Sequence, residues 1–330
     1  MKRILKYLFV LLVLGSVSSF VLMTDLQAVK SQLSSSLPAF ALILLISLFG
    51  YITGALAWRH CFSNTQVGFL KLLYTRSVGE LIALFNPTNI VAGEGFKIFS
   101  LKSDVSNKED LIDSIVLSRL VMIVSQLLIG IICLMYLFGI NWIWAALMVI
   151  CIIFSVQIFF KPDRSSSLNA PSPSAEYPHT IAGHLKKAWF LFQQSLARIK
   201  TTMTTNPKGL ALAFAWNTLH WMLGALEIFV ILLWLKHPTS FLGSLSIDTG
   251  VVILKSLAGF IPGQLGVEEL SNRLMLDVIG LKATSLWLSV SVLRRAKQLV
   301  WLSLAGLAFL IVQYFLKIKK SNNGHSVCNT

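Results

Sequence analysis

The sequence is poor in charged residues. Asp, Glu, Lys and Arg together make up 13% of its 330 residues, whereas about a quarter of the residues of a soluble domain are charged. Hydrophobic residues reach 55% and the mean hydropathy is +0.73. This composition excludes an ordinary soluble domain and a disordered chain, and it indicates an integral membrane protein.

Acidic residues and cysteines are also few. There are 14 Asp and Glu against 28 Lys and Arg, which gives a net charge of +14. In a membrane protein such an excess mostly sets orientation, so no nucleic acid partner is expected. The 4 cysteines form no CxxC or Cys/His cluster. A disulfide scaffold and a zinc site are therefore excluded, and neither a metal nor a cofactor is expected.

Long apolar stretches predict six membrane-spanning helices in an all-α fold, because about 20 apolar residues cross the hydrocarbon core. The first stretch resembles a signal peptide, but it is longer than a usual signal core and lacks a clear cleavage site, so we interpret it as a span. The predicted spans are Tyr7–Met23, Pro38–Trp58, Leu111–Leu137, Trp142–Phe160, Gly209–Leu235 and Leu281–Leu316.

The distribution of basic residues predicts the orientation of these spans. With the N-terminus in the cytoplasm, 19 of the 28 Lys and Arg lie on the cytoplasmic side, 2 lie outside, and the other 7 lie within the charged apolar tracts. This asymmetry follows the positive-inside rule. We therefore expect a single multi-pass domain over residues 1–330 in a bacterial cytoplasmic (inner) membrane, with both termini in the cytoplasm.

Two further segments, Val67–Phe96 and Thr249–Ile279, are apolar but interrupted by proline and glycine. A half-length apolar helix followed by such a break is typical of a re-entrant hairpin, which is tolerated where protein or a watery cavity covers its backbone. We predict breaks at Pro87 and Gly93 in the first segment and at Pro262, Gly263 and Gly266 in the second.

The two broken segments share a spacing of proline, glutamate and arginine. The pattern is Pro87, Glu94 and Arg119 in the first copy and Pro262, Glu269 and Arg294 in the second, with offsets of 7 and 25 in both. Three predicted spans separate the copies, so they would have opposite orientations. This predicts an inverted repeat, with repeat A at about 67–137 and repeat B at about 249–316, which is a transporter design.

Charged residues within these apolar segments are candidates for substrate binding, because an unpaired charge at the bilayer centre costs about 2.5–3.5 kcal/mol. We expect Glu94 and Glu269 to pair with Arg119 and Arg294, in or across the repeats. Remaining cations would then make the cavity cationic and would meet an anionic head group; they are Lys97, Arg273, Arg295 and Lys255. The alternative is that the ion pairs only hold helices together.

Two other features each allow two interpretations. His220 and Glu227 lie seven residues apart, which suits either a proton relay or an ordinary buried histidine. The region 161–208 is predicted to be a cytoplasmic loop that contains an amphipathic helix. That helix would lie either on anionic lipids of the inner leaflet or on the protein's own cytoplasmic face.

Four stretches of the sequence resemble motifs of one family, the bacterial lysylphosphatidylglycerol synthase transmembrane-region family, which is also described as flippase-like. The stretches are Gly93–Lys97, Ser114–Leu120, Ile261–Glu269 and Leu293–Arg294. Lys97 replaces an arginine of the family pattern, Gln264 replaces a glycine, and the acidic residues that the family places around Arg119 are missing. The resemblance extends from about Leu5 to Leu316.

The resemblance implies a flippase or transporter for a polar lipid with an anionic or zwitterionic head group. Its substrate-binding residues would be Glu94, Lys97, Arg119, Glu269, Arg273 and Arg294. The chain ends soon after Leu316, which leaves no room for a catalytic domain, so we expect no enzyme activity and a separate lipid-modifying synthase as a partner. The alternatives are a membrane enzyme acting on a lipid-linked phosphate or sugar, and a non-transporting scaffold of an envelope-lipid pathway.

Overall fold

The computed structural model describes seven stretches of the chain. They are residues 26–62, 67–85, 90–105, 107–139, 206–258, 266–282 and 284–326, with a few single residues between them. The predicted span Tyr7–Met23 lies outside these residues. So do nearly all of Trp142–Phe160 and of the predicted cytoplasmic region 161–208.

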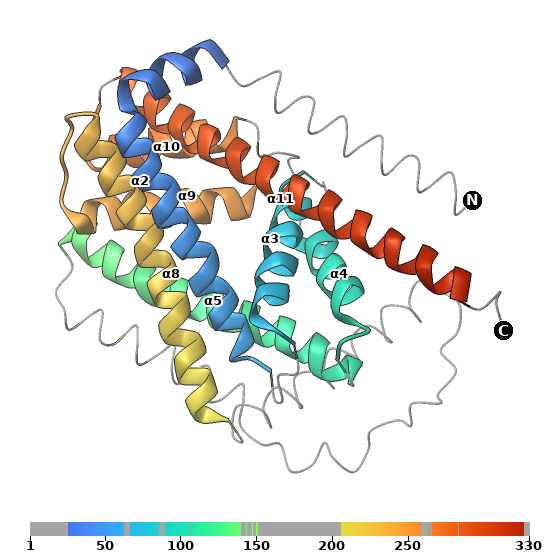
Figure 1. The fold of residues 1–330 in the computed structure, drawn as a ribbon. Coiled ribbons are helices and arrows are strands. Elements are labelled where there is room, and N and C mark those ends of the chain that lie inside the picture. The colour runs from blue at the N-terminus through green and yellow to red at the C-terminus, as the bar shows by residue number, and fades with distance from the viewer. Residues whose placement is uncertain are drawn as a thin grey trace, which may run out of the picture.

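Helices make up the fold in the described part of the chain (Figure 1), which confirms the predicted all-α class. Their bounds are α2 Leu26–Arg59, α3 Phe69–Phe85, α4 Ile90–Leu101, α5 Lys108–Phe138, α8 Pro207–Trp234, α9 Phe241–Leu257, α10 Val267–Val278 and α11 Thr284–Ser326.

Four of these helices are long and apolar enough to cross a membrane. Their candidate spans are Leu37–Arg59, Lys108–Phe138, Pro207–Trp234 and Leu286–Val312. Each coincides with one of the predicted spans, so the chain is a multi-pass membrane protein. The total of six spans stays a prediction, because the other two predicted spans fall outside the described residues.

Capping residues extend two of the spans beyond their apolar cores. The Asn107 side chain accepts a hydrogen bond from the backbone N–H of Glu109 at the start of α5, and Gly139 ends this helix with a φ of 60°. Asn206 caps α8 in the same way, and Pro207 occupies its first turn. Such residues satisfy backbone groups that the helix ends leave unpaired, so both helices begin before the apolar stretch does.

The two broken segments form two pairs of short helices. α3 and α9 each have 17 residues, and α4 and α10 each have 12. The second pair begins at Phe241 rather than at the predicted Thr249, because Ser240 caps α9 and its side chain accepts a hydrogen bond from the backbone N–H of Gly243. α3 packs on α4, and α9 packs on α10.

The glycines of these segments have two different roles. Gly93, predicted at a break, lies inside α4, and a Cβ there would stand 2.5 Å from the carbonyl oxygen of Gly79 on α3. It therefore allows close helix packing. Gly266 has a φ of 75° and precedes α10 directly, as expected of a break. Predicted breaks at Pro87, Pro262 and Gly263 lie outside the described residues.

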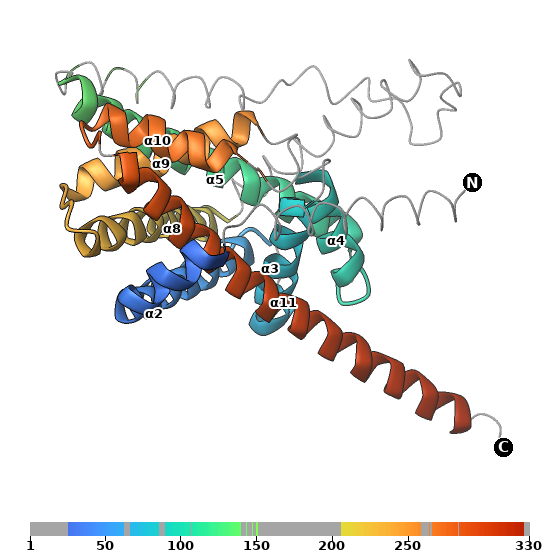
Figure 2. The ribbon, with the colours of Figure 1, turned by 90° about the horizontal axis from the view of Figure 1, so that it is seen from above.

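α2 and α8 run antiparallel along much of their length and pack against each other (Figure 1). One buried apolar cluster joins them to α9, α10 and α11, and another joins the end of α2 to α3, α4 and α5. Figure 2 shows α11 continuing far beyond the other labelled helices. Large apolar side chains such as Leu45, Leu127 and Leu307 are exposed on the outer faces, as expected of a surface in contact with lipid.

Candidate functional site

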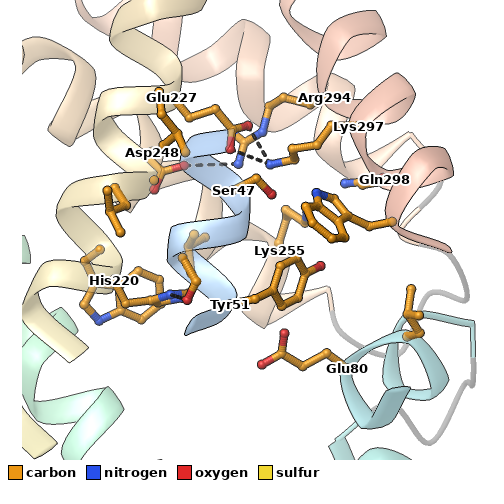
Figure 3. Close-up of a pocket in the computed structure, with 18 residues that line it drawn as sticks. Ser47, Tyr51, Glu80, His220, Glu227, Asp248, Lys255, Arg294, Lys297 and Gln298 are labelled. Atoms are coloured by element: carbon orange, nitrogen blue, oxygen red, sulfur yellow. Dashed lines mark hydrogen bonds and ion pairs between the residues drawn. The ribbon is translucent and has the colours of Figure 1, made fainter. Parts of the chain in front are cut away.

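A cavity of about 340 Å³ lies between α2, α3, α8, α9 and α11 (Figure 3). Its wall combines apolar side chains with many polar ones. The labelled polar residues of the wall are Ser47, Tyr51, Glu80, His220, Glu227, Asp248, Lys255, Arg294, Lys297 and Gln298. Three of these are carboxylates and three are Lys or Arg, so the wall is formally neutral. The expectation of a cationic cavity is thereby corrected.

Arg294 of α11 is the centre of a buried ion-pair network. Its Nη2 donates a hydrogen bond of 3.1 Å to Asp248 of α9 (Figure 3), and its Nε lies 3.2 Å from Glu268 of α10. The other carboxylate oxygen of Glu268, Oε2, accepts hydrogen bonds from Lys255 at 3.1 Å and from Gln298 at 2.8 Å. The network thus ties α9, α10 and α11 together at one end of the cavity.

Two more cations of α11 pair with neighbouring helices. The Lys297 Nζ donates to both carboxylate oxygens of Glu227 on α8, at 2.5 and 2.6 Å. Arg295 pairs with Glu269 of α10. Successive residues of a helix are turned by about 100°, so the three cations pair with different carboxylates.

The opposite side of the cavity is formed by α2, α3 and part of α8. Glu80 of α3 accepts a hydrogen bond of 2.8 Å from Arg76, which also donates to the carbonyl oxygen of Gly54 on α2. His220 donates from Nδ1 to the carbonyl oxygen of Gly50 at 2.9 Å. This fixed histidine suits the interpretation as a packed side chain, and the proton relay to Glu227 stays a prediction.

A second charged cluster lies beside the cavity, around Glu94 of α4. Glu94 accepts hydrogen bonds from Arg119 of α5, at 2.6 Å to Nε, and from Lys97 at 3.0 Å. The Lys97 Nζ also lies 5.3 Å from the ring centroid of Trp58. These side chains line a void of about 10 Å³, which Glu80 lines as well. Glu80 therefore stands between the two clusters.

The ion pairs agree with the sequence in one cluster and differ in the other. Glu94 and Arg119 pair as predicted. Glu269 does not pair with Arg294 but with Arg295, while Arg294 binds Glu268. The pairing therefore differs from the prediction by one residue along each helix. The reason is that Glu268 faces the buried side of α10.

The cations predicted to be left over are mostly paired. Lys97 and Lys255 bind Glu94 and Glu268, and Arg295 binds Glu269. Arg273 is exposed on α10, away from the cavity wall. A substrate contact of any of these residues stays a prediction.

The sequence motifs did not predict several residues of the cavity wall. Glu80, Asp248 and Gln298 belong to the wall, and Arg76 supports it from behind. The available signal was a lone charge within an apolar helix, which marks a functional position in membrane proteins. Within the described ranges, no group of three or more His, Cys, Asp or Glu side chains is arranged to hold a metal ion.

Comparisons with known proteins give one match. Residues 3–306 match the family described as lysylphosphatidylglycerol synthase TM region. Neither the curated proteins nor the solved structures provide a significant match. Since the family match covers far more than half of the 330 residues, the chain belongs to the lysylphosphatidylglycerol synthase TM region family.

Proposed function

We propose that the protein is a flippase or transporter that moves a polar lipid, either a phospholipid or a lipid-linked head group, across a bacterial cytoplasmic membrane. The observation that carries this proposal is the cavity, whose wall holds six ionisable Asp, Glu, Lys and Arg side chains among apolar candidate spans. Charged side chains enclosed by membrane-spanning helices are costly and typically mark substrate pathways. A polar head group that crosses the hydrocarbon needs a wall of this kind.

The order of the helices supports an inverted repeat. Each half of the described chain has a long helix, two short helices and a second long helix, in this order. The first set is α2, α3, α4 and α5, and the second set is α8, α9, α10 and α11. α2 ends at Arg59 and α8 at Trp234, and these two residues have the same separation along the chain as Glu94 and Glu269. The starts of the other three pairs of helices have nearly the same separation. One offset therefore relates the two sets of helices as well as the two glutamates.

The directions of the helices support opposite orientations of the two copies. α2 runs antiparallel to α8, and α5 runs opposite to α11 (Figure 1). Two copies related in this way can open alternately to the two sides of a membrane around a central site. The cavity is lined by α2 and α3 of the first set of helices and by α8, α9 and α11 of the second.

The short helices support re-entrant hairpins. At 1.5 Å per residue a 17-residue helix is about 26 Å long and a 12-residue helix about 18 Å, both less than the roughly 30 Å of the hydrocarbon core. Each pair would enter the membrane and return on the same side. Each hairpin would then carry its buried charges to the cavity from the side of the membrane at which it enters.

We infer that the chain itself transports its lipid and is not an enzyme, and that a separate synthase supplies a modified lipid. Both termini lie in the cytoplasm in this proposal, as the basic residues predict. Arg119, Lys97 and Arg273 would meet the head group on its way to or from the cavity. Family membership supports a role with a polar lipid in the membrane, since the family name refers to the membrane region of a lysylphosphatidylglycerol synthase.

A reconstitution experiment tests the proposal. The purified full chain is inserted into liposomes that contain phospholipids with a fluorescent acyl chain, and a membrane-impermeant reductant removes the fluorescence of the outer leaflet. The protein should expose inner-leaflet lipid faster than protein-free liposomes do. K297Q should slow this at least tenfold, because it removes a cation of the cavity wall, whereas K71Q, in an exposed pair on α3, should not.

Two results would contradict the proposal. The first is the same rate with and without protein for every phospholipid and lipid-linked head group tested. The second is chemical conversion of a lipid-linked substrate by the purified chain, which would support a membrane enzyme.

A further inference from the structure

Resting on the proposed function, we propose that the cavity selects a zwitterionic head group, with the phosphate at Lys255 and Lys297 and the ammonium group at Glu80. The argument depends on which member of each ion pair faces the cavity.

On the side of α9 and α11 the cations are more exposed than the carboxylates they pair with. The Lys255 and Lys297 side chains are 17% and 16% exposed, while their partners Glu268 and Glu227 are each 5% exposed. A ligand in the cavity therefore meets more of the two ammonium groups than of their carboxylates, although Glu227 also belongs to the wall. Such a surface favours a phosphate.

On the side of α3 the order is reversed. The Glu80 side chain is 33% exposed, while the side chain of its partner Arg76 is 6% exposed. Arg76 does not belong to the wall of the large cavity, whereas Glu80 does. A ligand there meets a carboxylate whose counter-ion lies behind it, which favours an ammonium group.

The two charged faces lie on opposite sides of one space. Figure 3 shows Glu80 across the cavity from Arg294 and Lys297, with Tyr51 between them. The volume of about 340 Å³ is at the lower end of the range for small-molecule sites, so it suits a head group rather than a whole lipid. Acyl chains would stay outside among the apolar helices.

Two hydrogen-bond donors without a partner belong to residues of the cavity wall. Among the described residues, neither the Nη1 of Arg294 nor the indole Nε1 of Trp301 has a hydrogen-bond partner, and both side chains belong to the wall. Buried donors are normally satisfied. A phosphate oxygen is an acceptor for donors of this kind, whereas an ammonium group offers no acceptor.

A head group with only a negative charge fits this wall less well. Its phosphate can occupy the cationic end, but nothing in it compensates the exposed carboxylate of Glu80, and charges interact strongly where water is scarce. An added ammonium group removes this mismatch. The cavity should therefore prefer a phosphate linked to a primary amine over a phosphate linked to a neutral alcohol.

A competition experiment measures this preference. The full chain in detergent is offered equal amounts of short-chain phosphatidylethanolamine and phosphatidylglycerol with identical acyl chains, and bound lipid is counted by native mass spectrometry. We expect at least a tenfold excess of the ethanolamine lipid, which corresponds to about 1.4 kcal/mol. O-phosphoethanolamine, added as a soluble competitor, tests whether the head group alone is sufficient or the acyl chains are required.

Variants that neutralise one charge each test which end of the cavity binds the ammonium group and which binds the phosphate. E80Q should reduce the preference to near unity while binding of phosphatidylglycerol is retained, and K297Q should weaken the binding of both lipids. D104N and K71Q are matched controls, because this pair lies at the surface and outside the cavity wall, and both should keep the preference. If E80Q does not fold, Glu80→Asp, which retains the charge but withdraws it, should give an intermediate preference.

Equal binding of the two lipids by the unmodified chain, or an unchanged preference in both Glu80 variants, would overturn the inference. This result is separable from a failure of the proposed function. A chain that shows the Glu80-dependent preference but moves no lipid in liposomes would retain the site and lose the transport proposal. A chain that moves lipids without this preference would retain the transport proposal and lose the proposed head-group site.

Discussion

Neutralising Arg294 should destabilise the protein strongly, because this side chain holds two buried carboxylates. In R294Q, Glu268 keeps Lys255 and Gln298, but Asp248 loses the one ion-pair partner that it has in the described part of the chain. Leaving a buried charge without its partner costs about 3–5 kcal/mol. The Asp248 side chain is only 7% exposed, so little of it can be solvated in place of the lost partner.

Neutralising the carboxylate of Asp248 should destabilise the protein less than neutralising Arg294. In D248N the guanidinium of Arg294 still faces Glu268, and the amide of the new side chain still offers an oxygen to Nη2. We expect a loss of about 1–3 kcal/mol, as for a perturbed buried hydrogen bond. The double variant R294Q/D248N has no unpaired charge, so it should be more stable than the sum of the single effects implies, by about 1–3 kcal/mol.

Equilibrium unfolding by sodium dodecyl sulfate in mixed micelles, followed by helix ellipticity, measures these free energies. The surface pair of Lys71 and Asp104 provides the control cycle, in which a coupling of at most about 1 kcal/mol is expected. Additive effects of R294Q and D248N, within about 0.5 kcal/mol, would refute the reasoning that Arg294 neutralises Asp248.

Three further changes test the packing and the helix ends by the same unfolding measurement. G93A should cost about 1–3 kcal/mol, because the new methyl group meets the backbone of α3, whereas G95A, which meets nothing within 4 Å, should be neutral or stabilising by up to about 1 kcal/mol; equal effects would contradict the role of Gly93. G266V should destabilise more than G266N, since a β-branched residue tolerates a φ of 75° poorly, and the reverse order would count against a strained turn before α10. N107A should cost about 1 kcal/mol by removing the cap of α5, while N107D should cost little; a loss shared by both would mean that capping is not the cause.

Hydropathy was sufficient to locate the four spans that the structure describes. It placed their ends less well, because caps such as Asn107 and Asn206 are polar and lie outside the apolar stretch that defines a span. The start of α9 was missed for the same reason, since Ser240 begins a helix that the apolar pattern alone places later. Local hydrogen bonds of single side chains decide these boundaries.

The charged site was only partly predictable. Glu94 and Arg119 were expected to pair, and they do. In the second cluster the sequence could not distinguish Glu268 from Glu269, because which of two adjacent residues faces a neighbour depends on how α10 is rotated in its packing. That rotation is set by contacts with α9 and α11, which no local pattern encodes.

The cavity itself required the packed structure. Glu80 of α3 and Lys297 of α11 lie far apart in the sequence, and only the arrangement of the helices brings them to one wall. The relative exposure within each ion pair, with the cation more exposed on one side and the carboxylate more exposed on the other, is likewise a property of packing.

The position of three cations on α11 has a mechanical consequence. Arg294, Arg295 and Lys297 lie close together on one continuous helix, yet their carboxylates belong to α8, α9 and α10. A rigid helix cannot turn or slide to release one of these pairs without straining the other two. Intermediate positions of α11 would leave several charges unpaired at once, so its movement is expected to be cooperative and to switch between two discrete states rather than to drift.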